Sequence, residues 1–88
     1  MLSMKQAVLL RAGEAGALKR FYYPGARFDV VLVAGRTRRA DSQALAEMAE
    51  LGWLVAPPES SPYAYARWLV TEAGRVEYRQ FKEARKWR

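Results

Sequence analysis

The sequence contains no cysteine and no histidine among its 88 residues. This composition excludes disulfide frameworks, Cys/His zinc sites, thiol nucleophiles and Ser-His-Asp triads. No glycine-rich segment has the spacing of a phosphate-binding loop. No pair of acidic residues has the basic or metal-binding neighbours that acid–base catalysis in a pocket requires. We therefore expect neither an enzyme nor a cofactor nor a metal site.

Long apolar runs are also absent. The longest, residues 30–34, is far shorter than the roughly 20 residues that cross a bilayer, and no segment resembles a signal peptide. We expect a soluble cytoplasmic protein with no membrane partner. At this length we expect one domain over residues 1–88, built around a single core.

Positive charge dominates the sequence, with 15 Lys and Arg against 9 Asp and Glu and a net charge of +6. Residues 1–40 hold eight basic and two acidic residues, residues 41–72 hold one and five, and residues 73–88 hold six and two. Two basic blocks thus flank an acidic middle. Such blocks favour a polyanionic partner, because Lys and Arg that neutralise phosphates release counterions.

Capping residues followed by apolar residues at helical spacing predict three helices. Their N-caps are Ser3, Asp41 and Thr71. Gly13 and Gly16 are expected to end the first helix, the second covers residues 42–51, and the third starts at Glu72 and can run to residue 88. The predicted inward face of the middle helix is formed by Ala44, Leu45, Met48 and Leu51. On the last helix, Tyr78 and Phe81 are expected to pack on the core. A basic stripe on another face of that helix consists of Arg75, Arg79, Lys82 and Lys86.

Alternating patterns and turn residues predict two β-hairpins. The first joins residues 18–23 to residues 27–33 through the Pro24-Gly25 turn, and we expect it to complete the core. The second joins residues 53–55 to residues 63–70 through a loop over residues 56–62. Its outward side chains are Tyr63, Tyr65, Arg67 and Leu69. The basic residues 36–39 are expected in a loop before the middle helix.

Two segments carry a resemblance to a known family: residues 44–54, which read Ala-Leu-Ala-Glu-Met-Ala-Glu-Leu-Gly-Trp-Leu, and residues 68–75, which read Trp-Leu-Val-Thr-Glu-Ala-Gly-Arg. They resemble the recognition helix with its following strand, and the strand-to-helix junction, of winged helix-turn-helix domains in bacterial regulators of the MarR and PadR type. The resemblance covers about residues 40–80. It implies an α+β fold of about three helices with a wing hairpin. An N-terminal hairpin replaces the usual second helix, as in short prophage and uncharacterised bacterial sequences.

The resemblance implies binding to double-stranded DNA, as in a small transcriptional regulator or a mobile-element accessory factor. Helix-turn-helix proteins contact bases with the first turn of the recognition helix. The expected phosphate or guanine contacts are Arg36, Arg38 and Arg39; the expected backbone, adenine or thymine contacts are Ser42, Gln43 and Ala46. The wing contributes Tyr63, Tyr65 and Arg67, and the stripe of Arg75, Arg79, Lys82 and Lys86 extends the basic surface.

The same residues support an alternative, a winged-helix module that associates with proteins and does not bind DNA. In that interpretation the arginines form a solvated loop, Ser42 and Gln43 only support the helix cap, and the wing tyrosines pack on their own sheet. Glu47 and Glu50 disfavour deep insertion into a groove, because phosphates repel carboxylates. The alternative includes a homodimer through the wing or through the last helix, where Phe81 and Trp87 pair across a two-fold axis.

Overall fold

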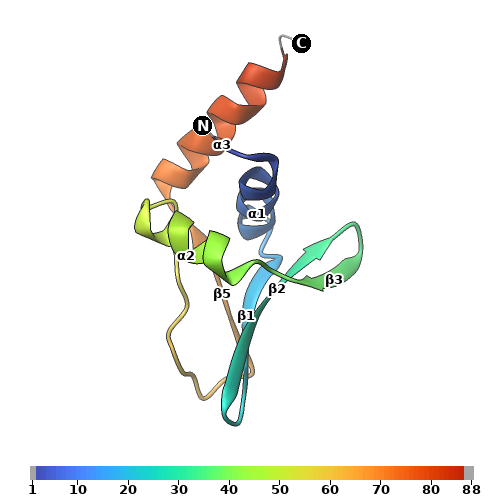
Figure 1. The fold of residues 1–88 in the computed structure, drawn as a ribbon, viewed down its shortest axis with the longest axis vertical. Helices are drawn as coiled ribbons and strands as arrows, with labels where there is room; N and C mark the ends of the chain where they lie inside the picture. The colour runs from blue at the N-terminus through green and yellow to red at the C-terminus, as the bar shows by residue number, and fades with distance from the viewer. Residues whose placement is uncertain (1, 87–88) are drawn as a thin grey trace.

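The chain folds into three helices beside antiparallel strands, in a computed structural model that describes residues 2–86 (Figure 1). In chain order the elements are α1 (Met4–Glu14), β1 (Leu18–Tyr23), β2 (Ala26–Val33), β3 (Arg36–Arg39), α2 (Ser42–Glu50), β4 (Leu54–Val55), β5 (Tyr65–Arg67), β6 (Leu69–Val70) and α3 (Glu72–Lys86). A four-stranded sheet has the order β3-β2-β1-β5, and β4 pairs with β6. The predicted α+β class is confirmed. No helix within residues 2–86 is long and apolar enough to cross a membrane.

All three predicted N-caps are present. The Ser3 hydroxyl accepts a hydrogen bond from the Gln6 amide at 3.1 Å, and the Gln6 side chain accepts one in return from the Ser3 amide. The Asp41 carboxylate accepts from the Ala44 amide at 3.1 Å, and the Thr71 hydroxyl accepts from the Gly74 amide. These bonds satisfy backbone donors that have no partner inside a helix. The starts of the helices therefore follow from local sequence.

The core lies between the helices and one face of the four-stranded sheet. Its most deeply buried large side chains are Leu10, Leu18, Leu45, Met48 and Trp68. As predicted, Tyr78 and Phe81 of α3 pack against it. In Figure 1 the helices lie together, and the β1–β2 ribbon extends away from them.

Helix α1 ends at Glu14, between Gly13 and Gly16, the two glycines expected to end it. Gly13 lies so close to β6 that an added Cβ would be 2.8 Å from Val70 Cγ2. One expectation for α2 is wrong. Leu51 was expected to face inward but is 58% exposed. The reason is that α2 ends at Glu50, and the chain turns away through Gly52 at a φ of +80°.

The first hairpin forms as predicted, and a third strand continues it. Strand β1 pairs with β2 from Leu18 opposite Val31 to Tyr23 opposite Ala26. The residues 36–39 form the edge strand β3, which corrects the expected loop. The turn between β2 and β3 is Ala34-Gly35, with φ values of 51° and 76°. Positive φ at both central residues is the geometry of a tight two-residue hairpin, which brings the arginines back alongside β2.

The second predicted hairpin is divided between two sheets. Its base forms as predicted, with Leu54 opposite Val70 and Val55 opposite Leu69. Residues 65–67, however, pair with β1. The intervening loop is rich in proline, which cannot donate to a strand ladder, and its carbonyl groups accept hydrogen bonds from β1 side chains. The predicted wing strand therefore joins the edge of the N-terminal sheet.

Candidate nucleic-acid interface

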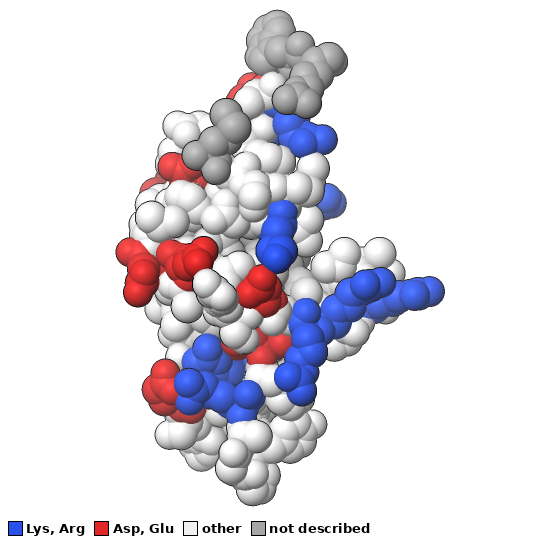
Figure 2. Space-filling view, viewed as in Figure 1, with Lys and Arg blue, Asp and Glu red and all other residues white. Residues whose placement is uncertain are grey.

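Edge strand β3 presents Arg36, Arg38 and Arg39, and all three residues are exposed. In the register, Arg38 lies opposite Val31 and Arg39 opposite Val30, so the side chains alternate between the two faces of the sheet. Among residues 2–86, none of the three forms an ion pair with a carboxylate. Figure 2 shows Lys and Arg side chains gathered on the hairpin that projects from the body of the protein. This hairpin carries cationic groups that are available to an anionic ligand.

A groove separates α1 from the β2–β3 hairpin. Its volume is about 710 Å³, and its lining includes Val8 and Leu9 of α1, Val31 and Val33 of β2, and Arg36 and Arg38 of β3. The lining is mostly apolar and also contains the basic residues Lys5, Arg36, Arg38 and Arg39. Sequence reasoning missed this groove because it depends on the strand that β3 adds. Three apolar residues of this lining, Met4, Val8 and Val33, remain exposed.

The start of α2 is held by contacts within the protein. The Ser42 hydroxyl donates to Asp29 Oδ2 at 3.3 Å, and Gln43 Nε2 donates to Glu47 Oε1 at 3.4 Å, while Ala46 is exposed. Asp41, the N-cap, also accepts from Lys5 Nζ at 2.9 Å. That hydrogen bond, followed by the one from the Ala44 amide, lowers the pKa of the Asp41 carboxyl. The first turn of α2 is thus fixed relative to α1 and β2.

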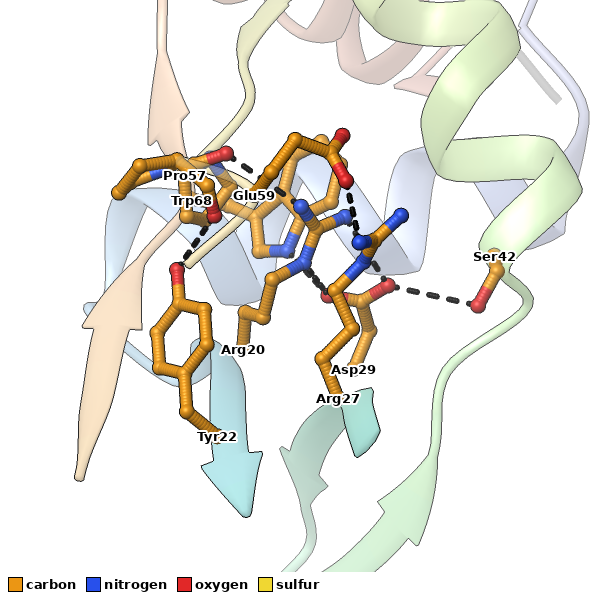
Figure 3. A network of polar contacts seen from close by, with 9 residues as sticks. Arg20, Tyr22, Arg27, Asp29, Ser42, Pro57, Glu59 and Trp68 are labelled. Carbon is orange, nitrogen blue, oxygen red and sulfur yellow. Dashed lines mark hydrogen bonds and ion pairs between the residues drawn. The ribbon is translucent and has the colours of Figure 1, made fainter. Parts of the chain in front are cut away.

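The carboxylate of Asp29 is the centre of a buried polar network (Figure 3). Asp29 Oδ1 accepts from Arg20 Nε and from Trp68 Nε1, both at 2.9 Å. Its Oδ2 accepts from Ser42 Oγ at 3.3 Å and from Arg20 Nη2 at 3.4 Å. Arg20 is 9% exposed and Asp29 is 4% exposed. Asp29 belongs to β2, and its partners come from β1, α2 and the segment before β6, so one carboxylate fixes the relative positions of four parts of the chain.

The loop after β4 covers this same face of the ribbon. Arg20 Nη1 donates to the Pro57 carbonyl at 3.3 Å, and the Tyr22 hydroxyl donates to the Pro58 carbonyl at 2.7 Å. Arg27 forms an ion pair with Glu59, as Figure 3 also shows. Below, this side of the sheet is called the buried face. It includes Leu18, Arg20, Tyr22, Asp29 and Val31.

The other side of the sheet, below called the open face, carries aromatic and basic side chains. It consists of Lys19, Phe21, Tyr23, Phe28, Val30, Leu32, Arg39, Tyr65 and Arg67, which share one side by register. Tyr65 is 42% exposed and Tyr23 is 59% exposed. Alternation along residues 27–33 predicts that Phe28, Val30 and Leu32 share one face, and the register confirms it. The alternation did not predict that this face lies opposite the core.

The remaining predicted site residues are dispersed. Tyr65 and Arg67 pair with β1 in the four-stranded sheet and not with β4, and Tyr63 is exposed in a bend before β5. On α3 all four residues of the basic stripe are exposed. Arg75 forms ion pairs with Glu14 and Glu72, which raise its pKa, and Lys86 forms one with Glu83. Trp87 lies outside the described residues.

Within residues 2–86, no three His, Cys, Asp or Glu side chains gather in a metal-binding arrangement. Comparisons with protein-family models, with curated proteins and with solved structures found no match to the chain. Inference about function therefore depends on the geometry of the hairpin, the start of α2 and the open face.

Proposed function

We propose that this protein binds duplex DNA as a small winged-helix protein, with β3 and the start of α2 as its contact surface. The observation that carries the proposal is the set of three exposed arginines on a projecting edge strand, without carboxylate partners among the described residues. Guanidinium groups donate several hydrogen bonds to phosphate and keep their charge at every physiological pH. Arg36, Arg38 and Arg39 are assigned to the phosphate backbone or to guanine edges.

The connection between β3 and α2 supports the same surface. Only Ala40 and Asp41 separate the last arginine from the first residue of α2. Ala46 and Gln43 lie on the exposed side of α2, where a base edge is reached in helix-turn-helix recognition. Glu47 and Glu50 lie toward the other end of the helix, so that end is assigned to the side away from the duplex. Arg79 and Lys82 of α3, which form no ion pair with residues 2–86, extend the attraction over a longer range.

The surface in this proposal is tested by titrating labelled duplex DNA of mixed sequence and following its fluorescence anisotropy at about 50 and about 200 mM salt. The double variant Arg36→Ala with Arg38→Ala removes two unpaired cations. We expect binding to weaken at least about tenfold at low salt. The slope of log affinity against log salt should become shallower by nearly 2, because each phosphate contact contributes about 0.9.

The matched control is Arg27→Ala with Arg75→Ala, which changes the net charge by the same amount. Both of these arginines are paired with carboxylates, so the control should weaken binding by no more than about threefold, an effect of net charge alone. Affinity that does not depend on salt, or equal losses in the two double variants, would contradict the proposal. Such results would assign the positive charge to solubility.

A second candidate, protein association without DNA binding, is favoured by the groove between α1 and the β2–β3 hairpin. Its lining presents Val8 and Val33 to solvent beside the basic residues of β3. The substitution Val8→Glu on α1 tests this candidate, because a carboxylate in an apolar groove prevents packing of an apolar partner. Loss of self-association in light scattering, with duplex binding retained, would favour association over DNA binding as the role of this groove.

A further inference from the structure

A continuous row of four aromatic rings crosses three strands on the open face. The ring centroids of Tyr23 and Phe28 are 5.4 Å apart, those of Phe28 and Phe21 are 6.0 Å apart, and those of Phe21 and Tyr65 are 5.6 Å apart. The first two pairs are stacked, with angles of 17° and 18° between their planes. The two ends of the row, Tyr23 and Tyr65, are the most exposed members.

The core packs on the opposite side of the sheet, so the row is not needed to fill it. None of the four aromatic residues belongs to the buried core cluster or packs against it. Burial in the core is the ordinary reason for a group of aromatic side chains. Contiguous exposed aromatic surface on a small protein marks an interaction site.

The charges on the open face all have one sign. Lys19, Arg39 and Arg67 lie on it, and the strands place no carboxylate there, because Asp29 points to the buried face. Arg39 lies over the Phe28 ring, with 4.5 Å from its guanidinium carbon to the ring centroid, and Lys19 Nζ lies 4.7 Å from the Tyr65 centroid. Arg39 and Lys19 are therefore each held beside a ring, and the strands place no acidic neighbour beside them on this face.

We propose that the open face binds single-stranded nucleic acid. Bases stack on the exposed ends of the aromatic row and on the Arg39 guanidinium plane, and phosphates pair with Lys19, Arg39 and Arg67. This combination of stacking rings and flanking cations recognises single strands with little sequence preference. A duplex does not fit these rings, since its bases are stacked on one another and present only their edges in the grooves. Arg39 belongs to both proposed surfaces, but the aromatic rings lie on the opposite face of the sheet from Arg36 and Arg38.

A second copy of this chain is a poorer occupant. If two open faces came together, three cations of one copy would lie opposite three cations of the other, with no carboxylate between them. Removing these like charges from water costs free energy. An apolar peptide would leave the same cations without partners. A polyanion with planar apolar groups satisfies both features of the face, and nucleic-acid single strands are the ligands with that chemistry.

The test uses labelled oligothymidine and oligouridine of about 12 nucleotides and a duplex of the same length, followed by fluorescence anisotropy with the intact chain. The variants Tyr23→Leu and Tyr65→Leu remove one exposed ring each and keep an apolar side chain. We expect each to weaken binding of the single strand about tenfold or more, the usual effect of losing one stacked base. Tyr63→Leu is the matched control: this tyrosine is 75% exposed and outside the row, and its loss should change binding by less than about twofold.

Amide chemical shifts recorded with and without oligothymidine provide a readout that does not depend on affinity. Shift changes should concentrate on β1, β2 and β5. Tighter binding of the thymidine or of the uridine strand supports the proposal and identifies DNA or RNA as the ligand. Equal affinity of all three Tyr variants, or shift changes confined to α1 and α3, would overturn it.

The two proposals fail in different ways. Arg36→Ala with Arg38→Ala should weaken duplex binding and change single-strand binding by less than about threefold, because neither residue lies on the open face. If Tyr23→Leu and Tyr65→Leu weaken single-strand binding and the duplex does not bind, only the function proposed for β3 and α2 is refuted. If the duplex binds and the single strand does not, only the open-face site is lost.

Discussion

Each face of the four-stranded sheet carries an arginine that lies over an aromatic ring, but one arginine is buried and the other is exposed. On the buried face, Arg20 lies over the Trp68 ring at 5.0 Å and is also paired with Asp29. On the open face, Arg39 lies over the Phe28 ring at 4.5 Å without a carboxylate. Burial requires the first charge to be neutralised and hydrogen-bonded. Arg39 is hydrated by solvent and needs no such partner, so its charge remains available to a ligand.

The two faces differ because successive side chains of a β-strand point to opposite sides of the sheet. Phe28, Asp29 and Val30 are consecutive, yet Asp29 points to the buried face and its neighbours to the open face. A shift of the register by one residue would exchange the two sets and bury the cations without partners. The Asp29 network therefore specifies the register as well as the packing. Substitutions on the two faces should differ most clearly in their effect on folding.

The largest effect is expected for Asp29→Ala on the buried face. It leaves Arg20 buried without a counter-ion and Trp68 Nε1 without an acceptor, so the free energy of unfolding should fall by about 3–5 kcal/mol. Denaturant unfolding followed by tryptophan fluorescence measures the change. Tyr65→Leu on the open face is the comparison and should alter stability by less than about 1 kcal/mol. Similar losses in the two variants would refute the division between the faces.

A smaller effect on stability is expected for Gly74→Ala in α3, and its sign is opposite to that of the usual Gly→Ala substitution in a helix. In an exposed helix interior this substitution stabilises by about 1 kcal/mol. Here an added Cβ would clash with the Trp53 carbonyl oxygen, so the backbone must move, and we expect a loss of about 1–3 kcal/mol. Thermal unfolding gives the sign directly. Gln80→Ala, on the exposed side of α3, should stay within about 0.5 kcal/mol of the parent, and a gain in stability for Gly74→Ala would disprove the close contact.

The smallest effect concerns Asp41, an exposed residue where β3 leads into α2. Its pKa lies below the ordinary 3.8, mainly because of the hydrogen bond from Lys5. A carboxyl with a lowered pKa in the folded state contributes stability above its unfolded pKa and loses it as pH falls through the folded pKa. The stability difference between the parent and Asp41→Asn should therefore shrink below about pH 4. In a carbon NMR titration Lys5→Ala should raise the Asp41 pKa, and an unchanged value would show that the pair does not form in solution.

Elements with a local chemical signal could be predicted from the sequence. The caps at Ser3, Asp41 and Thr71 and the Pro24-Gly25 turn depend on residues within four positions of one another. Their hydrogen bonds join residues that are close in the chain, so the sequence by itself indicates them. The pairing of Leu54 with Val70 was also predictable, because apolar residues flank the loop on both sides.

Elements that depend on distant partners could not be predicted. Strand β3 is a run of basic residues without an apolar alternation, and only its pairing with β2 makes it a strand. Strand β5 has an alternation that suits either sheet, and its pairing with β1 was decided by the loop contacts of Arg20 and Tyr22. The candidate site shares this limitation. The exposed arginines were visible in the sequence, whereas the aromatic row combines Tyr65 with rings more than 30 residues earlier in the chain.

By itself, the sequence determined the α+β class, the starts of the three helices, the first hairpin and a positive charge in two blocks, because these depend on composition and on neighbouring residues. Tertiary structure alone decided which face of each strand is covered. The partners of Asp29 lie 9, 13 and 39 residues away from it in the chain. A single carboxylate can satisfy all three only when β1, β2, α2 and the Trp68 segment converge, and this convergence leaves the aromatic row on the side that faces solvent.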